Sequence, residues 1–237
     1  MNNFRNLVFS LAVLAALVGA CAAQEGRNFP TSNTQPKLIF YGGDVNPDDP
    51  NAYAFANGNT LAVLAQTYGC VSIPYTKSFY VSGFLFNIVA NVQSGMIFDP
   101  MTATYDVRRT IGTGHGGLDV KSGTAALTLT PTGRMPFGET EYSAVIMLPG
   151  ALKVDAGGAW CINVTPQCTD QANPLCSQVE FFVDNTTQRT NAINPKVELP
   201  QYLWVYSTAL GYNWDNWCSL GLNAEQCAYL SFGIYGY

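Results

Sequence analysis

The chain has 237 residues, of which 11% are charged, and it carries a formal net charge of −5 at pH 7. Ordinary globular proteins contain about 25% charged residues, so uncharged polar and aromatic side chains must cover much of this surface. Because the balance is acidic and no basic cluster occurs, nucleic acids and anionic membrane surfaces are excluded as partners.

The N-terminus is predicted to be a secretory signal peptide, residues 1–23. Arg5 supplies a positive charge, and an apolar run over residues 7–20 is too short to span a bilayer. Cleavage after Ala22 or Ala23 would make the chain more negative by one charge, because this leader contains one arginine and no acidic residue.

The expected location is outside the cell. Two N-glycosylation sequons begin at Asn163 and Asn185 and favour a eukaryotic secretory route. An alternative is a bacterial lipoprotein, since the residues before Cys21 resemble a lipobox, in which that cysteine becomes the lipidated N-terminus. No later segment is predicted to span a membrane, because the longest apolar stretch, residues 84–92, is too short and contains asparagines.

Six cysteines follow the leader, and an even number in an exported chain predicts three disulfides. They are Cys70, Cys161, Cys168, Cys176, Cys218 and Cys227. Closeness in the sequence pairs Cys168 with Cys176 and Cys218 with Cys227, which leaves Cys70 for Cys161; other connectivities stay open. A zinc site is not expected, because CxxC spacing with nearby histidines does not occur.

After a polar arm over residues 24–36, the chain alternates between strand and turn signals. The predicted strands are 37–41, 79–92, 96–99, 104–111, 125–130, a hairpin over 142–165, 179–183, 201–206 and 229–235, while 60–71 fits a strand or a short helix. Gly83 predicts a β-bulge, and one short helix is expected at residues 223–229.

A new strand about every 10–20 residues, with Gly, Pro and Asn between, is typical of two packed antiparallel sheets. The predicted fold is an all-β antiparallel sandwich, jelly-roll-like, over residues 37–237, with few short helices and with disulfides as staples. In the hairpin, Trp160, Ile162 and Val164 are expected to point inward, so Asn163 and a glycan on it would point into solvent.

The glycine pair Gly157-Gly158, followed by the strand with Trp160, resembles parts of secreted jelly-roll domains, including carbohydrate-binding modules. The resemblance covers about 50 residues and implies a sandwich fold. It does not by itself imply a function, because one fold hosts many functions.

Few residues suit catalysis, and no enzyme is predicted. His115, the single histidine, lies in the stretch GTGHGG, which is interpreted as an exposed turn rather than an active-site loop. The activity that comes closest is glycoside hydrolysis, which needs two carboxylates. The candidate pairs are Glu139 with Glu141 and Glu180 with Asp184.

A calcium site is one interpretation of Asp44, Asn46 and Asp48, whose spacing matches the first three oxygen ligands of a calcium loop. The sixth and twelfth positions, Asp49 and Phe55, do not fit an EF-hand. An Asx-rich turn is therefore the favoured interpretation, and no cofactor is predicted.

Aromatic residues are concentrated near the C-terminus. Tyr202, Trp204 and Tyr206 share one face of a predicted strand, which is interpreted as the core face, with a sugar-stacking surface as the alternative. The residues predicted to form a contact surface in the loop that follows are Tyr212, Trp214 and Trp217.

Two functions from different classes fit these features. The favoured one is a secreted, non-enzymatic structural or adhesive glycoprotein that assembles with itself or with other extracellular proteins through its terminal segments. The alternative is a carbohydrate-binding domain that uses the aromatic surface around Trp214 and Trp217, with glycans as partners.

Overall fold

The protein is an all-β sandwich, as the sequence predicts. The computed structural model describes residues 35–46, 48, 54–59, 64–72, 78–92, 94–155, 157–170, 172–177, 179–186, 191–193, 203–207, 211, 213–216 and 230–237. All strands within these ranges belong to one compact unit, Pro36–Tyr237, and their pairings are antiparallel.

The described residues form thirteen strands and two short helical turns. In chain order they are β1 (Lys37–Tyr41), β2 (Ala54–Ala56), β3 (Gly58–Asn59), β4 (Leu64–Ser72), β5 (Phe79–Asn91), β6 (Pro100–Arg109), β7 (Leu118–Pro131), η1 (Pro136–Gly138), β8 (Glu141–Val154), β9 (Ala159–Cys168), α2 (Pro174–Ser177), β10 (Glu180–Asp184), β11 (Leu203–Ser207), β12 (Asn213–Asn216) and β13 (Phe232–Gly236). Within these described ranges, no helix has the length and apolar character needed to cross a membrane.

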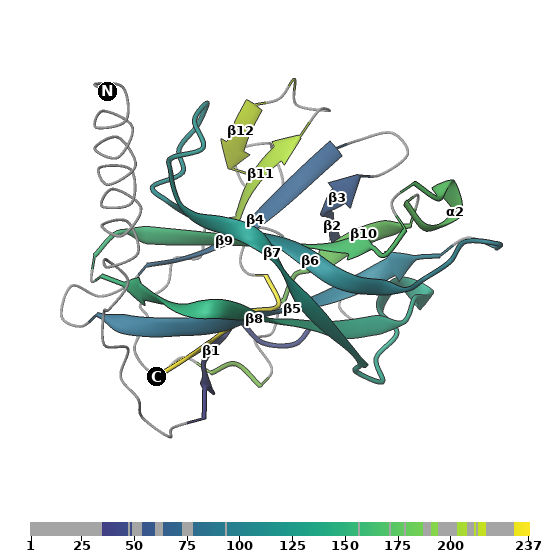
Figure 1. The fold of residues 1–237 in the computed structure, drawn as a ribbon, viewed down its shortest axis with the longest axis horizontal. Coiled ribbons are helices and arrows are strands. Elements are labelled where there is room, and N and C mark those ends of the chain that lie inside the picture. The colour runs from purple at the N-terminus through teal and green to yellow at the C-terminus, as the bar shows by residue number, and fades with distance from the viewer. Residues whose placement is uncertain are drawn as a thin grey trace, which may run out of the picture. The chain divides into compact units, whose positions relative to one another are not determined.

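Two sheets face each other across the core (Figure 1). The first sheet runs β1–β13–β5–β8. In the same sheet, β10 also pairs with β5, and β2 pairs with β10. The second sheet runs β6–β9–β4–β11–β12, with β3 beside β4. β7 belongs to both sheets, since residues 118–126 pair with β6 and residues 127–131 pair with β8.

Apolar side chains from both sheets fill the space between them. β5 contributes Phe86 and Ile88, which are completely buried, and β9 contributes Trp160, Ile162 and Val164, which point inward as predicted. Burying one such side chain stabilises the fold by about 1.5–3 kcal/mol, so this shared core is the main source of stability.

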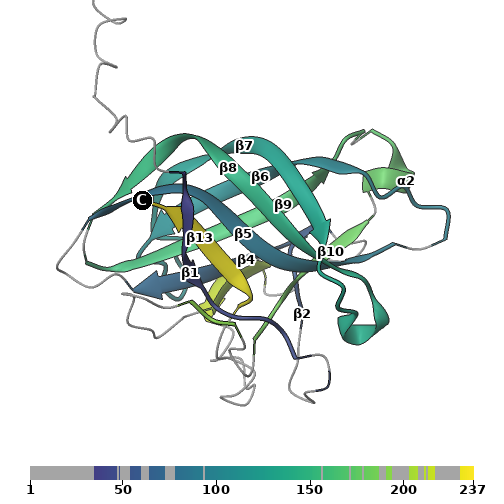
Figure 2. The ribbon, with the colours of Figure 1, turned by 90° about the horizontal axis from the view of Figure 1, so that it is seen from below.

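β5 is long enough to take two partners along one edge (Figure 2). Its first half pairs with β13 and its second half with β10, while β8 lies along its other edge. The register with β8 shifts between Val81 and Gly83, which confirms the predicted bulge. A Cβ atom on Gly83 would lie 2.5 Å from the carbonyl oxygen of Ile146, so only glycine fits there.

Two details of the strand prediction are wrong. β8 and β9 do not form a hairpin: β8 pairs with β5 and β7, whereas β9 pairs with β4 and β6, so the chain crosses between sheets after β8. Residues 96–99 are not a strand but lead into β6. Alternating apolar residues identify a strand, but they do not identify its neighbours.

β8 also continues through Pro149-Gly150, inside the region predicted to be a hairpin. Leu152 pairs with Val81 and Met147 pairs with Gly83, so the four residues 148–151 lie opposite a single residue of β5. The hydrogen-bond ladder between β8 and β5 is interrupted at this bulge, so proline and glycine are accommodated there.

A disulfide joins two neighbouring strands of the second sheet. Cys70 on β4 and Cys161 on β9 lie directly opposite each other, and both are buried. This pair is one of those expected from the sequence. The expected pair Cys218 with Cys227 lies outside the described residues.

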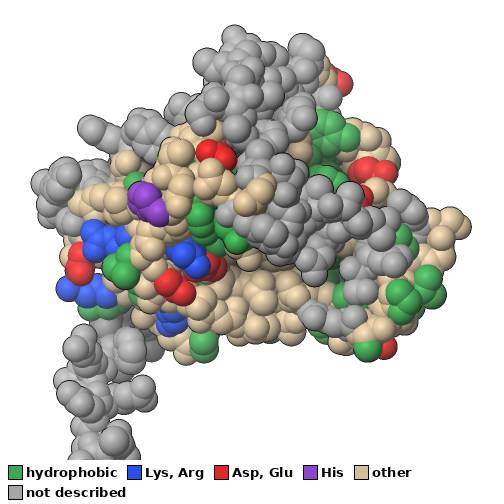
Figure 3. Space-filling view, turned by 90° about the horizontal axis from the view of Figure 1, so that it is seen from above, with side chains coloured by type: hydrophobic (Ala, Val, Ile, Leu, Met, Phe, Trp, Pro, Cys, Tyr) green, Lys and Arg blue, Asp and Glu red, His purple; other side chains and the backbone are tan. Residues whose placement is uncertain are grey.

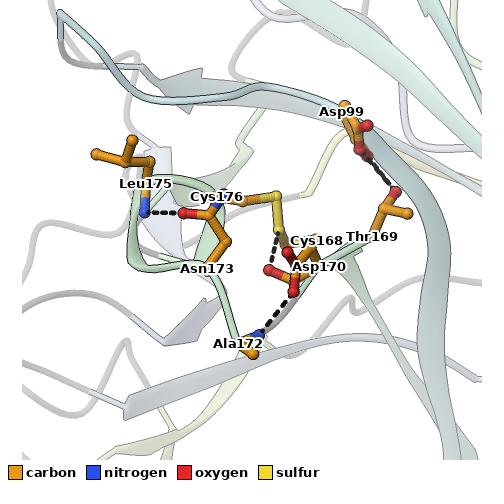
Figure 4. Close-up of a disulfide and its surroundings, with 8 residues drawn as sticks. All are labelled: Asp99, Cys168, Thr169, Asp170, Ala172, Asn173, Leu175 and Cys176. Atoms are coloured by element: carbon orange, nitrogen blue, oxygen red, sulfur yellow. Dashed lines mark hydrogen bonds between the residues drawn. A yellow bond between two sulfur atoms is a disulfide. The ribbon is translucent and has the colours of Figure 1, made fainter.

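A second disulfide, between Cys168 and Cys176, closes the loop that carries α2 (Figure 4). It is also an expected pair. The amide of Leu175 donates a hydrogen bond to Oδ1 of Asn173 at 3.0 Å, which forms an Asx turn at the start of α2. The bridge therefore fixes a loop that has little apolar packing of its own.

Removing the two bridges should destabilise the protein unequally. The bridged cysteines are 91 residues apart in one case and 8 in the other. Loop-closure entropy predicts a stabilisation of about 4–5 kcal/mol for the long loop and about 2–3 kcal/mol for the short one. We expect C70A/C161A to lower the free energy of unfolding in urea by about 2 kcal/mol more than C168A/C176A. Equal losses would contradict this expectation.

Candidate functional site

Four aromatic residues gather on the outer face of the second sheet, the side turned away from the main core. Trp204 on β11 pairs with Tyr68 on β4, and Tyr206 on β11 pairs with Trp214 on β12. Residues that lie opposite each other on adjacent strands point to the same face. We refer to Tyr68, Trp204, Tyr206 and Trp214 as the outer-face cluster.

The ring of Trp214 lies at the centre of this cluster. Its centroid is 5.1 Å from that of Tyr68 and 5.1 Å from that of Tyr206, and the guanidinium of Arg108 lies 5.2 Å from its centre. Tyr68 is completely buried, while the other three aromatic side chains are partly exposed. Trp214 therefore contacts both tyrosines, and the part of the cluster that reaches solvent consists of Trp204, Tyr206 and Trp214.

Polar groups beside the cluster neutralise each other. Tyr68 Oη donates a hydrogen bond to Asp106 Oδ2 at 2.7 Å, and Arg108 Nε donates to the same oxygen at 2.6 Å. Burial, together with the charge and hydrogen bond of Asp106, raises the pKa of Tyr68, so its hydroxyl stays a donor. Burial lowers the pKa of Arg108, but Asp106 raises it more, so the ion pair persists.

The turn between β6 and β7 lies against Trp214. The amide of Gly114 donates to the carbonyl oxygen of Trp214 at 2.8 Å, and Arg108 Nη1 donates to the carbonyl oxygen of Gly116 at 3.2 Å. A Cβ atom on Gly116 would lie 2.6 Å from the indole, so glycine lets the ring pack against the turn. His115 is exposed in this turn, as predicted, and Figure 3 shows it beside basic side chains.

The inward direction predicted for Trp204 and Tyr206 is wrong. Leu203 and Val205 point into the main core and are buried, so the residues that alternate with them point outward. Either phase of the alternation fits the sequence, because both sets of side chains are apolar or aromatic. The other predicted aromatic residues, Tyr202, Tyr212 and Trp217, lie outside the described residues.

Three residues at this site, Tyr68, Asp106 and Arg108, were not predicted from the sequence. Asp106 and Arg108 are two apart in a predicted strand, which does place them on one face. Nothing in the sequence links that face to Trp214, which follows much later in the chain. The sheet order, which brings β4, β11 and the turn after β6 together, makes the connection.

A network of buried amides and hydroxyls covers β9 on its outer side. Asn163 Nδ2 donates to Asn57 Oδ1 at 2.6 Å and to the carbonyl oxygen of Thr67 at 2.8 Å. Thr165 Oγ1 donates to Asn163 Oδ1 at 2.8 Å, and Asn57 Nδ2 donates to the carbonyl oxygen of Val164 at 2.7 Å. β9 is therefore buried on both faces, although one face is polar.

The solvent-exposed position predicted for Asn163 is wrong, since its side chain is only 2% exposed. A glycan would be attached through the same Nδ2 atom that makes these two hydrogen bonds, so the folded structure has no room for it. Asn185, in the other sequon, is 1% exposed. Neither predicted glycosylation site presents its asparagine to solvent.

Two of the three side chains proposed for calcium, those of Asp44 and Asn46, have partners within the protein. Asn46 Oδ1 accepts the amide hydrogen of Asp48 at 3.2 Å, which forms the Asx turn favoured by the sequence. Asp44 accepts a hydrogen bond from Tyr41 and forms an ion pair with Arg134 at 3.1 Å. Within the described ranges, no three Asp, Glu, His or Cys residues are grouped to hold a metal ion.

The structure does not assemble the two carboxylate pairs proposed from the sequence. Glu139 is exposed after η1, whereas Glu141 is completely buried at the start of β8. Glu180 accepts a hydrogen bond from Asn91 at 3.0 Å, while Asp184 is completely buried. Burial, together with the charge and hydrogen bonding of Glu141, raises the pKa of Asp184, so one carboxyl from each proposed pair affects the other away from solvent.

Truncating Asn57 tests the buried network. The substitution N57A removes three hydrogen bonds, those with Val164, Thr67 and Asn163, from a site without solvent. Because buried groups then lose their partners, we expect the free energy of unfolding to fall by about 2–4 kcal/mol, measured by urea denaturation. The control T128A, on the exposed side of β7, should stay within about 0.5 kcal/mol of the parent protein. A similar effect of both substitutions would show that the network contributes little.

Comparison with known proteins adds no relative: no protein-family model matches this chain, and a search of curated proteins found no match. Its function is therefore inferred from the geometry of its own residues.

Proposed function

We propose that this protein is an extracellular binding protein that recognises a neutral glycan through the outer-face cluster. The observation that carries this proposal is the outward direction of Trp204 and Tyr206, which are partly exposed rather than buried in the main core. Flat aromatic rings stack on the apolar faces of sugar rings. The two disulfides are compatible with an oxidising, extracellular environment.

The surroundings of the cluster favour a ligand without charge. Arg108 and Asp106 pair with each other at 2.6 Å, so neither charge is available to select an ionic group. Gln66 on β4 lies opposite Tyr206, and Asn216 on β12 lies opposite Trp204, so both amides are on the face of the cluster. Amide side chains form hydrogen bonds with hydroxyl groups.

The test is glycan binding by single-residue variants. The parent protein is screened on a glycan array, and the affinity for the best neutral glycan is measured by titration calorimetry. We expect W204A and Y206A each to weaken binding at least about tenfold, or about 1.4 kcal/mol, because each removes a stacking surface. Y237A, which removes an exposed tyrosine elsewhere, is the matched control and should bind like the parent.

Unfolding curves of each variant show whether a loss of binding reflects a loss of structure. The proposal fails if the parent protein binds no neutral glycan on the array. It also fails if folded W204A and Y206A bind as tightly as Y237A.

A second candidate function, structural self-assembly, is favoured by the edge strand of the first sheet. This edge strand is β1, which pairs with β13 on one side. On its other side, the described residues supply one isolated bridge, between Tyr41 and Ile193. Backbone groups along an edge strand are able to pair with a strand from another molecule. Leu38 and Ile39 add partly exposed apolar side chains to this edge.

A charge placed on this edge separates the two functions. If molecules assemble through β1, the parent protein forms species larger than a monomer in size-exclusion chromatography with light scattering. We then expect I39K to shift the protein to monomers, because lysine on an edge strand opposes pairing between sheets. T128K, with its charge on the exposed side of β7, should leave the assembly unchanged. A parent protein that is monomeric at all concentrations excludes assembly through β1.

A further inference from the structure

A buried acidic cluster lies in the first sheet, apart from the outer-face cluster. It consists of Asp44, Arg134, Glu141 and Asp184, and Tyr41 borders it. Glu141 and Asp184 are both 0% exposed. Arg134 forms ion pairs with Asp44 and with Glu141 and is the only cation that the described residues bring to this cluster.

Three carboxylate oxygens in this cluster have no hydrogen-bond partner. Glu141 Oε2 accepts from Thr132 and from Arg134, but its other oxygen, Oε1, accepts from no group. Both Oδ1 and Oδ2 of Asp184 are buried and also have no partner. Buried polar atoms are almost always hydrogen-bonded, so these three oxygens indicate a missing donor; Arg134 Nε is a buried donor of the same cluster, but it is not hydrogen-bonded to any of them.

The charges of the cluster also do not balance. Asp44, Glu141 and Asp184 would carry three negative charges when ionised, against one positive charge on Arg134. Placing two carboxylates together without water is costly, and the usual solution is that one of them keeps a proton. A protonated carboxyl also has an O–H group, which is the donor that the unpaired oxygens lack.

We propose that Asp184 keeps its proton and donates it to Glu141 Oε1, and that this shared proton locks β1, β10 and the start of β13 into the first sheet. The proton gives both side chains a hydrogen bond and leaves the cluster with one negative charge less. Asp184 is also the group whose pKa is raised, by burial first and then by the charge and hydrogen bond of Glu141.

Hydrogen bonds connect the acidic cluster to the terminal strands. The amide of Ser231, just before β13, donates to the carbonyl oxygen of Asp184 at 2.7 Å, and Ser231 Oγ donates to the carbonyl oxygen of Gly43 at 2.6 Å. Asn87 Nδ2, from β5, donates to Ser231 Oγ at 2.8 Å and also to Tyr41 Oη. The titratable groups around the Glu141–Asp184 pair are therefore Arg134, Asp44 and Tyr41. The neutral groups around it are Asn87 and Ser231.

The shared proton makes stability depend on pH in a defined direction. In the unfolded chain Asp184 ionises near its ordinary pKa of 3.8, whereas in the folded chain it stays protonated to higher pH. Between these two pKa values the folded state binds one proton more than the unfolded state, so its stability falls as pH rises. The contribution is complete below the unfolded pKa and is lost once pH has passed through the folded pKa.

The experiment compares the parent protein with D184N across pH. An asparagine has the same shape, and its Nδ2 donates a hydrogen bond to Glu141 Oε1 at every pH. From pH 5 upward, the unfolding equilibrium constant of the parent, measured in urea, should rise about tenfold per pH unit relative to that of D184N, until the folded pKa is reached. D155N, which alters an exposed carboxylate paired with Lys153, is the control and should keep the parent's pH profile above pH 5.

Direct observation of the carboxyl group covers the case in which D184N does not fold. Carboxyl ¹³C resonances of the parent protein are followed through the titration, and Asp184 should keep the chemical shift of a protonated acid well above pH 5. In hydrogen exchange, corrected for intrinsic rates, amides of β1, β10 and β13 should lose protection with rising pH before those of β6 and β9 do.

Three results would overturn the proposal. The first is an Asp184 carboxyl that titrates in the ordinary acidic range. The second is a D184N variant whose stability has the parent's dependence on pH. The third is a parent protein whose stability rises with added calcium or magnesium chloride and falls with a chelator. That result would show that a bound cation, rather than a proton, pairs with these oxygens.

Discussion

Face-to-face packing of two sheets around one apolar core is the interaction on which the rest of this structure depends. The core draws on both sheets, from Phe86 and Ile88 on β5 to Trp160 and Ile162 on β9. β7 crosses from one sheet to the other and connects them along one side. Because the core fixes which side of each strand faces inward, it also decides which residues are left for the outer faces.

On the second sheet, the outer face has its own packing. The Cys70–Cys161 bridge and Ile111 form a small apolar base for Tyr68 and Trp214. The aromatic rings are thereby held in place by side chains below them. If the cluster binds a glycan as proposed, this support orders the site before binding, which lowers the entropy cost of binding.

The protein contains two buried polar regions that differ in how their hydrogen bonds are satisfied. The network around Asn57 and Asn163 consists of neutral groups whose donors and acceptors match, so it needs nothing from solvent. The cluster around Glu141 and Asp184 has more acceptors than donors and an excess of negative charge. A polar core of the first kind is insensitive to pH, whereas one of the second kind is linked to proton binding.

Features that depend on neighbours along the chain could be predicted from the sequence. Alternating apolar residues located most of the strands, Gly83 located the bulge, and short spacing paired Cys168 with Cys176. The histidine turn and the Asx turn at Asn46 were also predictable, because they are formed by residues a few positions apart.

The neighbours of each strand and the covered faces of each sheet follow from the folded structure and could not be predicted from the sequence. Trp204 and Leu203 alternate in the same strand, and the sequence gives no measure of which side holds the core. Asn163 lies on a face that is polar yet buried, since Asn57 reaches it from a distant segment. Glu141 and Asp184 were assigned to different carboxylate pairs because the sequence does not show which strands meet. A period of two residues specifies the face of a strand on which a side chain lies. Contacts between strands are set by the order of strands in the sheet and by the chain that covers it.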